Sequence, residues 1–507
     1  MKRNYLKYTL IVLLGMGVIS CKKSFLQTTP KGEFLESNYY QTPAQAFSGL
    51  VAAYDPLVTE TGGLDETYIN PLGPLNSASD DAYAGGGGST DTPDWQVWNN
   101  YTVNPAQGPQ AGFWKVNFLG VSRTNTILSK LGNVPGLDPA TAKRYTGEAL
   151  FLRAHYLFDL VRLFKNIPLI TTPLDPSTIY NQPQAAPTAV YAQIESDLTT
   201  AIADLPATVV TTENGRVTGG AAVALLGKVY LYEQKWAQAA TQLAIVNGTT
   251  PGGVTPTYNY QLQASFAAIF NPNNKFNSEA ILEIPHTSTQ NYSWNNWDSF
   301  KGNVYVQMTG PRDFSDATYA GGWGFNPITT QLHDAMQNAN DPRYGYTILN
   351  LDSLSALEHK TYTPSYQNTG YFSLKYAPLT KFKSATGTVE LNYPNDYIEI
   401  RLADTYLMEA EALVQSGGNA GRALALLTAV RARVGLAPVP ATLANIYNER
   451  RFELALEGHR WFDLVRWGQA ATTLAFKGFK AGTNELLPIP LNELSNTKLV
   501  QNPGYAK

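Results

Sequence analysis

The chain has 507 residues, of which 44% are hydrophobic and only 15% are charged, so it is long enough to bury a large core. Its formal net charge is −3, and a chain without a basic excess is poorly suited to nucleic acid. Aromatic residues reach 12%, with 30 tyrosines and 9 tryptophans, and this excess calls for an explanation.

The N-terminus has the pattern of an export signal. Cations within the first seven residues precede an apolar run over residues 10–19, which is shorter than the roughly 20 residues of a membrane-spanning helix. The run ends in Val18-Ile19-Ser20-Cys21, which resembles a bacterial lipobox, so we expect removal of residues 1–20 and lipidation of Cys21. Removal of Lys2, Arg3 and Lys7 leaves 34 basic residues against 40 acidic ones, a formal charge of −6. Cys21 is the only cysteine, which excludes intrachain disulfides.

Three stretches carry apolar side chains at helical spacing. Residues 146–164 predict one amphipathic helix. Residues 221–246 predict two helices broken near Gln234-Lys235, and residues 400–434 predict two helices around Ser416-Gly417-Gly418, where the glycines can take the positive φ that ends a helix. Such antiparallel pairs are typical of tetratricopeptide-like repeats, although unrelated helical hairpins would give the same pattern.

Two long stretches, residues 62–110 and 251–394, lack a sustained period and are rich in Gly, Pro, Asn and aromatic residues. We expect long loops with a few short strands there. Disordered segments are poor in aromatic residues, so these stretches are interpreted as ordered excursions from a helical scaffold. Long ordered loops usually carry function.

The sequence contains few signs of catalysis. The five histidines form no HExxH pair, and neither a GxSxG nucleophile motif nor a phosphate-binding loop is present. Asp80-Asp81 is the best local pair of carboxylates, but adjacent side chains usually point apart. Glu449, Glu453 and Glu457 recur every four residues beside arginines, so we expect solvated or structural ion pairs there. We therefore expect no catalytic residue, no metal and no cofactor.

Several segments, taken together, resemble the SusD/RagB family. They are EALFLRAHYLFDLVRLFKNIPLI at 148–170, RLADTYLMEAEAL at 401–413, NERRFELALEGHRWFDLVRWG at 448–468 and LPIPLNELSNTKLVQNPGY at 487–505. Their order and spacing match the family, and the lipobox stands in front of them. The resemblance covers nearly the entire mature chain.

The resemblance implies a mostly α fold of tetratricopeptide-like helical pairs. It also implies a lipoprotein anchored to the outer membrane through Cys21, at the cell surface, whose loops bind a glycan. The usual partner is a TonB-dependent transporter of the SusC type. We expect a signal peptide over 1–20 and a single domain over 21–507, with a scaffold over about 40–250 and 395–475 and ligand-binding loops over about 62–110 and 251–394.

Flat aromatic rings suit a glycan because the C–H faces of a pyranose stack on them, while amide and carboxylate groups bond to its hydroxyls. NYSWNNWDSF at 291–300 offers both kinds of group, as do SDDAYAGG at 79–86 and DTPDWQVWNNY at 91–101. Trp323, between two glycines, is a further candidate, and Arg343 is a weaker one. The predicted ligand-binding residues are Asp80, Asp81, Tyr83, Trp95, Trp98, Tyr292, Trp294, Asn296, Trp297, Trp323 and Arg343.

The sequence thus predicts a non-catalytic lipoprotein that captures oligosaccharide or polysaccharide and delivers it to a transporter, with no nucleic acid as partner. Two alternatives stay open. One is a polysaccharide hydrolase or lyase on a helical scaffold, because its two carboxylates need not be near in sequence. The other is a binder of peptide or another nutrient, to which aromatic platforms are equally suited.

Overall fold

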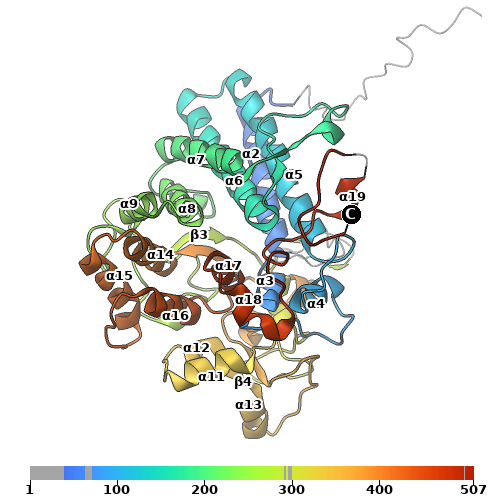
Figure 1. The fold of residues 1–507 in the computed structure, drawn as a ribbon, viewed down its shortest axis with the longest axis vertical. Helices are drawn as coiled ribbons and strands as arrows, with labels where there is room; N and C mark the ends of the chain where they lie inside the picture. The colour runs from blue at the N-terminus through green and yellow to red at the C-terminus, as the bar shows by residue number, and fades with distance from the viewer. Residues whose placement is uncertain (1–38, 63–70, 290–292, 295–299, 496, 507) are drawn as a thin grey trace, which may run out of the picture.

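Helices dominate the protein and its strands are short (Figure 1). The computed structural model describes residues 39–62, 71–289, 293–294, 300–495 and 497–506. The structure confirms the predicted fold class, which is mostly α with a few short strands. None of the described helices is both long and apolar enough to cross a lipid bilayer.

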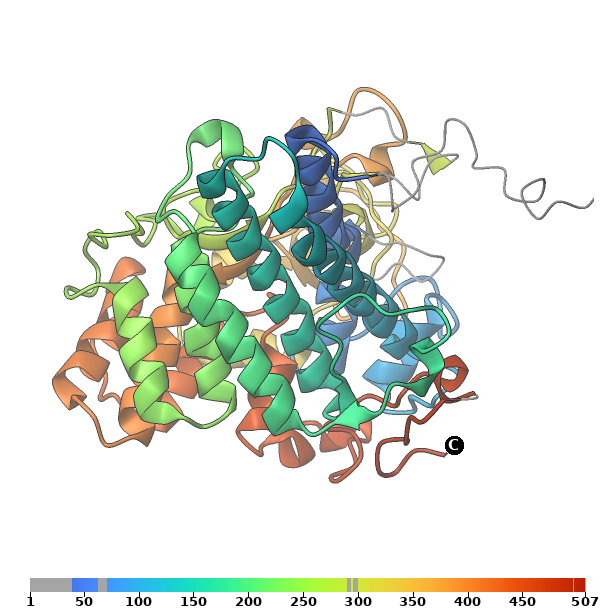
Figure 2. The same cartoon turned by 90° about the horizontal axis from the view of Figure 1, so that it is seen from above.

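The scaffold is a row of helices, each packed on the next in the chain. Its members are α2 (Pro43–Gly62), α5 (Gln110–Lys130), α6 (Pro139–Phe164), α7 (Pro187–Asp204), α8 (Gly219–Tyr232), α9 (Trp236–Asn247), α14 (Leu402–Gln415), α15 (Ala420–Arg433) and α16 (Leu443–Glu453). Figure 2 shows the long helices of its first half lying side by side. Helix α9 then packs on α14, and α14 packs on α15 and α16. The contact between α9 and α14 joins the two halves of the scaffold, which a long segment separates in sequence.

Helix α6 confirms the predicted helix over 146–164 and begins one to two turns earlier. Asp138 caps it, because its side chain accepts a hydrogen bond from the backbone N–H of Thr141, and Pro139 occupies the first turn. The C-terminal two thirds of α6 are buried on nearly all sides, since α5 and α7 both pack against it. Helix α6 is therefore the central element of the first half of the scaffold.

The two predicted helix pairs are also confirmed, with small shifts. Helix α8 ends at Tyr232 and α9 begins at Trp236, and Gln234 between them takes φ 59°. In the second pair Gly417 takes φ 65°, as expected, but Gly418 is outside the positive-φ region. The first helix of that pair starts at Leu402, because the two residues before it belong to a strand.

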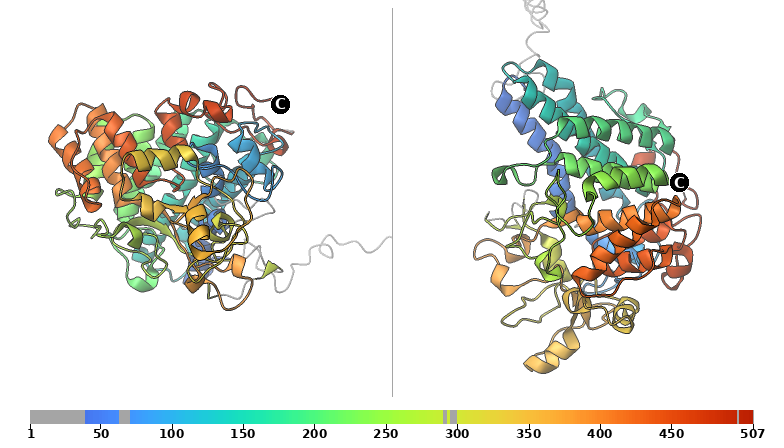
Figure 3. Two further views of the ribbon diagram at one scale, coloured as in Figure 1. Left: turned by 90° about the horizontal axis from the view of Figure 1, so that it is seen from below. Right: turned by 90° about the vertical axis from the view of Figure 1, so that its left-hand side faces the viewer.

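The segments expected to be irregular contain short helices that the sequence did not reveal. Residues 62–110 include α3 (Leu72–Ala78) and α4 (Pro93–Asn99), and residues 251–394 include α10 (Val304–Thr309), α11 (Thr330–Asn338), α12 (Tyr344–Thr347) and α13 (Leu351–Glu358). Most are of two turns or fewer, too short to show a helical period. Helices α11 to α13 lie at the end of the molecule away from α5 to α7 (Figures 1 and 3).

The strands pair antiparallel in twos. Strand β3 (Ala280–Ile284) pairs with β6 (Tyr397–Arg401), β4 (Ile348–Asn350) with β5 (Tyr371–Ser373), and β1 (Ile167–Pro168) with β2 (Gln184–Ala185). The first of these pairs joins the start and the end of the long segment to the scaffold, because β6 runs directly into α14. The segment between β3 and β6 therefore leaves the scaffold and returns to it at one place.

After α16 the chain forms the short helices α17 (Arg460–Arg466), α18 (Ala470–Thr473) and α19 (Leu491–Leu494). A buried charge network joins α16 and the turn that follows it to β6. Arg401 on β6 is 1% exposed and donates to Glu279 at 2.8 Å, to Glu453 at 2.6 Å and to Glu457 at 2.8 Å. Glu449 and Glu453 both accept from Arg343. Of the two kinds of ion pair expected for these glutamates, the structural kind is found. Breaking a buried pair of this kind is costly because one charge is left without a partner.

Candidate functional site

The indoles of Trp294 and Trp323 come from two separate loops and lie against each other. Their ring centroids are 6.3 Å apart and their planes differ by 21°. This distance lies within the range of about 4.5–7 Å in which aromatic rings contact one another, so a sugar would stack on an outer face of the pair. Trp294 is 43% exposed and Trp323 is partly buried against the core. Tyr292, Asn296 and Trp297, from the same predicted stretch as Trp294, lie outside the described residues.

Backbone hydrogen bonds to α10 and its C-terminal turn hold the segment around Trp323. The N–H of Trp323 donates to the carbonyl of Gln307 at 2.9 Å, and the N–H of Gly324 to that of Gly310 at 2.7 Å. Gly322 is required here because a Cβ at this position would lie 2.3 Å from the Cα of Gly310. The indole is therefore carried on a strand-like segment whose position is set by close backbone packing.

The glycine-rich loop after SDDAYA lies against the other edge of the same segment. The N–H of Gly86 donates to the carbonyl of Gly324 at 2.8 Å. Gly85 and Gly86 take φ 73° and 80°, which glycine adopts without strain. The buried side chain of Gln96 on α4 donates to the carbonyls of Gly85 at 2.8 Å and Asp91 at 3.1 Å. The two predicted ligand-binding segments thus meet, as a binding site requires.

A cavity of about 340 Å³ opens where these segments meet. Polar side chains on its wall come from both sides, and Trp323 and Phe325 supply aromatic surface. Its charged lining residues are Arg312 and Asp313, which follow α10, and Asp91, in the glycine-rich loop. The lining residues are Asp91, Thr92, Met308, Arg312, Asp313, Gly322, Trp323 and Phe325.

Asp80 and Asp81 were expected at the ligand, but the structure buries both in ion pairs with the C-terminal helices. Arg460 Nε lies 2.7 Å from Asp80, and Arg451 lies 2.9 Å from each of the two carboxylates. Burial alone would raise the pKa of Asp80, but Arg460 and Arg451 outweigh it and lower the pKa. For Asp81 burial prevails and the pKa is raised. These carboxylates fix the loop on the scaffold and do not face the cavity.

Tyr83, in the same loop, is half-buried. Its ring lies 5.0 Å from the ammonium group of Lys477, which also donates to the carbonyls of Ser77 and Ala82 at 2.6 Å each. Burial lowers the pKa of Lys477 to about 7, although the nearby carboxylates act in the opposite sense. Tyr83 thus has a structural partner on one side, and its contact with a ligand stays a prediction.

Trp95 and Trp98 were also expected to be platforms, and the structure corrects this prediction. Each is 1% exposed. The Trp95 ring packs on Phe325 with centroids 5.3 Å apart, and a Cβ at Gly73 would lie 1.9 Å from it. Trp98 packs on Trp461 at 5.2 Å. Both indoles fill the core beneath the candidate site, so neither offers a face to a ligand.

Arg343 is likewise corrected, because it is fully buried. It donates to Asp341 at 2.6 Å, to Glu449 at 2.6 Å and to Glu453 at 2.8 Å. The sequence suggested a loop arginine, but these carboxylates lie close to it in space and two of them come from α16, about a hundred residues further along the chain. A guanidinium with this many carboxylate partners has little capacity left for a ligand.

Arg312 and Asp91 were missed by the sequence analysis. Nothing in TGPRDF at 309–314 or STDTPD at 89–94 distinguishes them from other charged loop residues. The useful signal was the surrounding composition, because Arg312 stands in a segment of Gly, Pro and aromatic residues with few other cations. Their proximity depends on the contact between two loops more than 200 residues apart.

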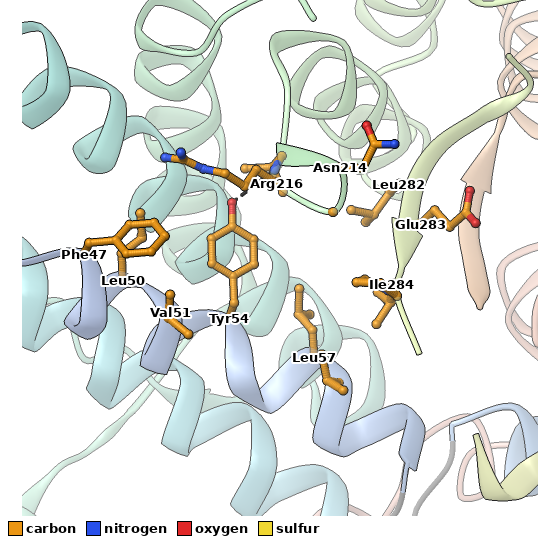
Figure 4. A pocket seen from close by; sticks show the side chains of 14 residues that line it. Phe47, Leu50, Val51, Tyr54, Leu57, Asn214, Arg216, Leu282, Glu283 and Ile284 are labelled. Atoms are coloured by element: carbon orange, nitrogen blue, oxygen red, sulfur yellow. Dashed lines mark hydrogen bonds between the residues drawn. The ribbon is translucent and has the colours of Figure 1, made fainter. Parts of the chain in front are cut away.

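A second cavity, of about 180 Å³, lies between α2 and β3 (Figure 4). Its wall is mainly apolar, with Phe47 and Val51 from one side and Leu282 and Ile284 from the other. Of its two charged lining residues, Arg216 is already engaged with Glu148 and Glu213, and Glu283 accepts from the backbone N–H of Phe276. A sugar needs hydroxyl partners as well as apolar surface, so the cavity beside Trp323 is the better candidate for a glycan.

Comparisons with known proteins show which class of protein this chain belongs to. A model described as the SusD family matches residues 336–505, and one described as starch-binding and associating with the outer membrane matches residues 34–231. A solved laminarin-binding SusD-like protein is 47% identical with a TM-score of 0.88, covering 92% of this chain and 100% of its own. Surface glycan-binding protein A from Bacteroides thetaiotaomicron, solved with laminarihexaose, is 26% identical with a TM-score of 0.80, covering 91% and 99%. A SusD-like protein of Bacteroides ovatus is 24% identical over 92% of this chain and 83% of its own.

These similarities extend over nearly the full length of the chain and include both halves of the scaffold. The helical fold of this chain is shared with solved proteins that are named for glycan binding. The protein belongs to the SusD family, as the resemblance of its sequence segments predicted.

Proposed function

We propose that this protein captures a laminarin-like glucan at the cavity beside Trp323 and does not cleave it. The observation that carries the proposal is the stacked Trp294–Trp323 pair, of which Trp294 is exposed, next to a cavity with polar walls. The pair supplies flat apolar surface for a pyranose face, and the cavity supplies groups for its hydroxyls. The solved relative at 47% identity is named for laminarin binding, which supports this choice of glucan.

Starch is the second candidate, because the model that matches residues 34–231 is described as starch-binding. Calorimetry with laminarihexaose and with a malto-oligosaccharide of equal length separates the two. We expect binding heat with laminarihexaose, a weaker response to the malto-oligosaccharide and no new reducing ends after prolonged incubation. Binding of neither sugar, or release of shorter products, would contradict the proposal.

We also propose that the mature chain from Cys21 to the C-terminus acts as one unit, anchored to the outer membrane through lipid on Cys21 and displayed at the cell surface. The lipobox-like sequence supports the anchor. In cells, Cys21→Ala should move the protein from the membrane fraction to the periplasmic fraction. Wild-type and variant proteins that fractionate alike would exclude the anchor.

The captured glucan is proposed to pass to a TonB-dependent transporter of the SusC type. Family membership supports this partner, because the resemblance to the SusD/RagB family implies a transporter of this type. Affinity purification of the lipidated protein from its native membrane should recover such a transporter, identified by mass spectrometry. A protein recovered without it, under conditions that keep outer-membrane complexes intact, would count against the partnership.

A further inference from the structure

Two opposite charges face the cavity beside Trp323 without forming an ion pair. Arg312 Nε is buried, and within the part of the chain that the structure describes it has no hydrogen-bond partner. Asp91 lines the same cavity, yet none of its carboxylate oxygens lies within 4.0 Å of an Arg312 nitrogen, the distance that defines an ion pair. Arg343 and Arg401 are fully engaged with carboxylates. Arg162 and Arg433 also have a buried Nε without a hydrogen bond, but each is ion-paired with a carboxylate, whereas Arg312 forms no ion pair with any described residue.

The position of Gly87 limits the distance between Arg312 Nη1 and Asp91 Oδ2. A Cβ added at Gly87 would lie 2.7 Å from Arg312 Nη1 and 3.2 Å from Asp91 Oδ2. The two polar atoms are thus separated by no more than these distances together, 5.9 Å, and by more than 4.0 Å. A hydroxyl that accepts from a guanidinium at about 2.9 Å and donates to a carboxylate at about 2.7 Å spans roughly 4.6–5.6 Å between them. One hydroxyl fits this gap.

Both side chains are held so that the gap stays open. Asp91 Oδ2 accepts from the backbone N–H of Gly87 at 2.6 Å, which ties the carboxylate to its own loop. The stem of Arg312 passes close to Gly324, where a Cβ would lie 2.7 Å from Arg312 Cγ. The carbonyl of Arg312 also accepts from the N–H of Thr363 at 3.0 Å. These contacts hold the Asp91 carboxylate and the backbone and stem of Arg312 on opposite sides of the gap.

We propose that Arg312 and Asp91 form a divided ion pair that binds one hydroxyl of the sugar stacked on Trp323. This inference rests on the proposed function. The guanidinium donates to the hydroxyl oxygen, and the hydroxyl donates to the carboxylate, so that both charges gain a partner at once. A carboxylate or sulfate group in this place would be repelled by Asp91, and an amine by Arg312. The pair accordingly selects a neutral glycan with a free hydroxyl.

A double-mutant cycle tests the pair, with laminarihexaose as the probe in calorimetry. Arg312→Met removes the donors and keeps the stem, and Asp91→Asn keeps an oxygen for Gly87. Each change should weaken binding about tenfold, since hydrogen bonds to charged groups are of this strength. The double variant should lose little more than either single variant, because both act on one hydroxyl. Asp334→Asn, at an exposed position on α11 that does not line the cavity, is the matched control and should stay within about twofold of wild type.

The outcomes separate this inference from the function on which it rests. If Arg312→Met and Asp91→Asn bind like wild type while Trp323→Ala does not, the divided pair is wrong and the proposed function stands. Losses that multiply in the double variant would also overturn a shared hydroxyl. If wild type binds no glycan, both proposals fall. Arg312→Lys covers the case in which Arg312→Met does not fold: it keeps the cation without the planar fork, and full affinity in this variant would contradict the geometry.

Discussion

The chain contains two tryptophan pairs of identical spacing, and Trp294, the described member of one pair, lies in an environment opposite to that of the other pair. Trp95 and Trp98 stand in WQVW and are both buried in the core. Trp294 begins WNNW, is 43% exposed and stacks on the indole of Trp323 from another loop. The same residue type at the same spacing thus serves packing in one loop and is proposed to serve ligand binding in the other.

The difference lies in what surrounds each pair. WQVW follows Pro93 and forms α4, in which a spacing of three residues puts both indoles on one face of a helix. That face meets Gly73, whose missing side chain leaves room for Trp95. WNNW has only amide side chains between its tryptophans, and no such helix was predicted for it. A pair of tryptophans therefore shows its role through its neighbours in space, which its spacing alone does not disclose.

The largest expected effect is on stability. Trp98→Ala should lower the free energy of unfolding by about 3–5 kcal/mol, because a buried indole leaves a large cavity. Trp294→Ala is the matched control and should change it by about 0.5 kcal/mol or less. Chemical denaturation of both variants checks this prediction. A reversed order of the two losses would invert the comparison between the buried and the exposed pair.

Arg343 sharpens the comparison for charged residues, since it too was expected at the ligand. Arg343→Met should lower the free energy of unfolding by about 3–5 kcal/mol, because buried carboxylates lose their partner. Arg123→Met is the matched control: its ion pair with Asp55 is about one third exposed, so we expect a loss of about 0–1 kcal/mol. If urea denaturation gave equal losses of unfolding free energy for the two variants, the burial of the Arg343 ion pairs would not add to stability.

The buried histidine His459 predicts that stability depends on pH. Burial lowers the pKa of His459 to about 4, although Asp404 and Glu457 act in the opposite sense. The unfolded chain binds the proton first, so stability should fall as the pH drops from about 6.5 to 4, by up to roughly 3 kcal/mol. His459→Gln should flatten this part of the stability curve, measured by thermal unfolding. His359→Asn, at an exposed position, should leave the curve unchanged, and an unchanged curve in His459→Gln would refute the assignment.

The smallest expected effect is on affinity. Trp323→Ala should weaken laminarihexaose binding by about 1–3 kcal/mol, and Trp294→Ala by about 1 kcal/mol, because each removes part of one stacking surface. Trp323→Phe keeps a flat ring and should recover part of the loss. Calorimetry on folded variants checks this order. Full affinity in both alanine variants would move the binding site elsewhere on the molecule.

Much of the fold could be predicted from the sequence, because long helices carry many repeats of their period. Helix α6 and the pairs α8–α9 and α14–α15 were found for this reason. Helix α3 was not, since it has only seven residues, all of them buried, and therefore no polar face to reveal a period. Family resemblance supplied what periodicity could not, namely the protein class.

The candidate site was less predictable, because it depends on contacts between distant segments. The glycine-rich loop and the Trp323 segment are joined by backbone hydrogen bonds, and their common role in ligand binding stays a prediction. Asp80 and Arg343 were assigned to the ligand because their partners come from α16 and α17, which the local sequence does not indicate. Arg312 was overlooked for the converse reason, as only the folded structure shows that its Nε has no hydrogen-bond partner among the described residues.

A crystal structure of the protein with laminarihexaose tests the central claim most directly. We expect one pyranose ring stacked on an outer face of the Trp294–Trp323 pair, with one of its hydroxyls between Arg312 and Asp91. An oligosaccharide bound at another surface, with both indoles left uncovered, would contradict the account.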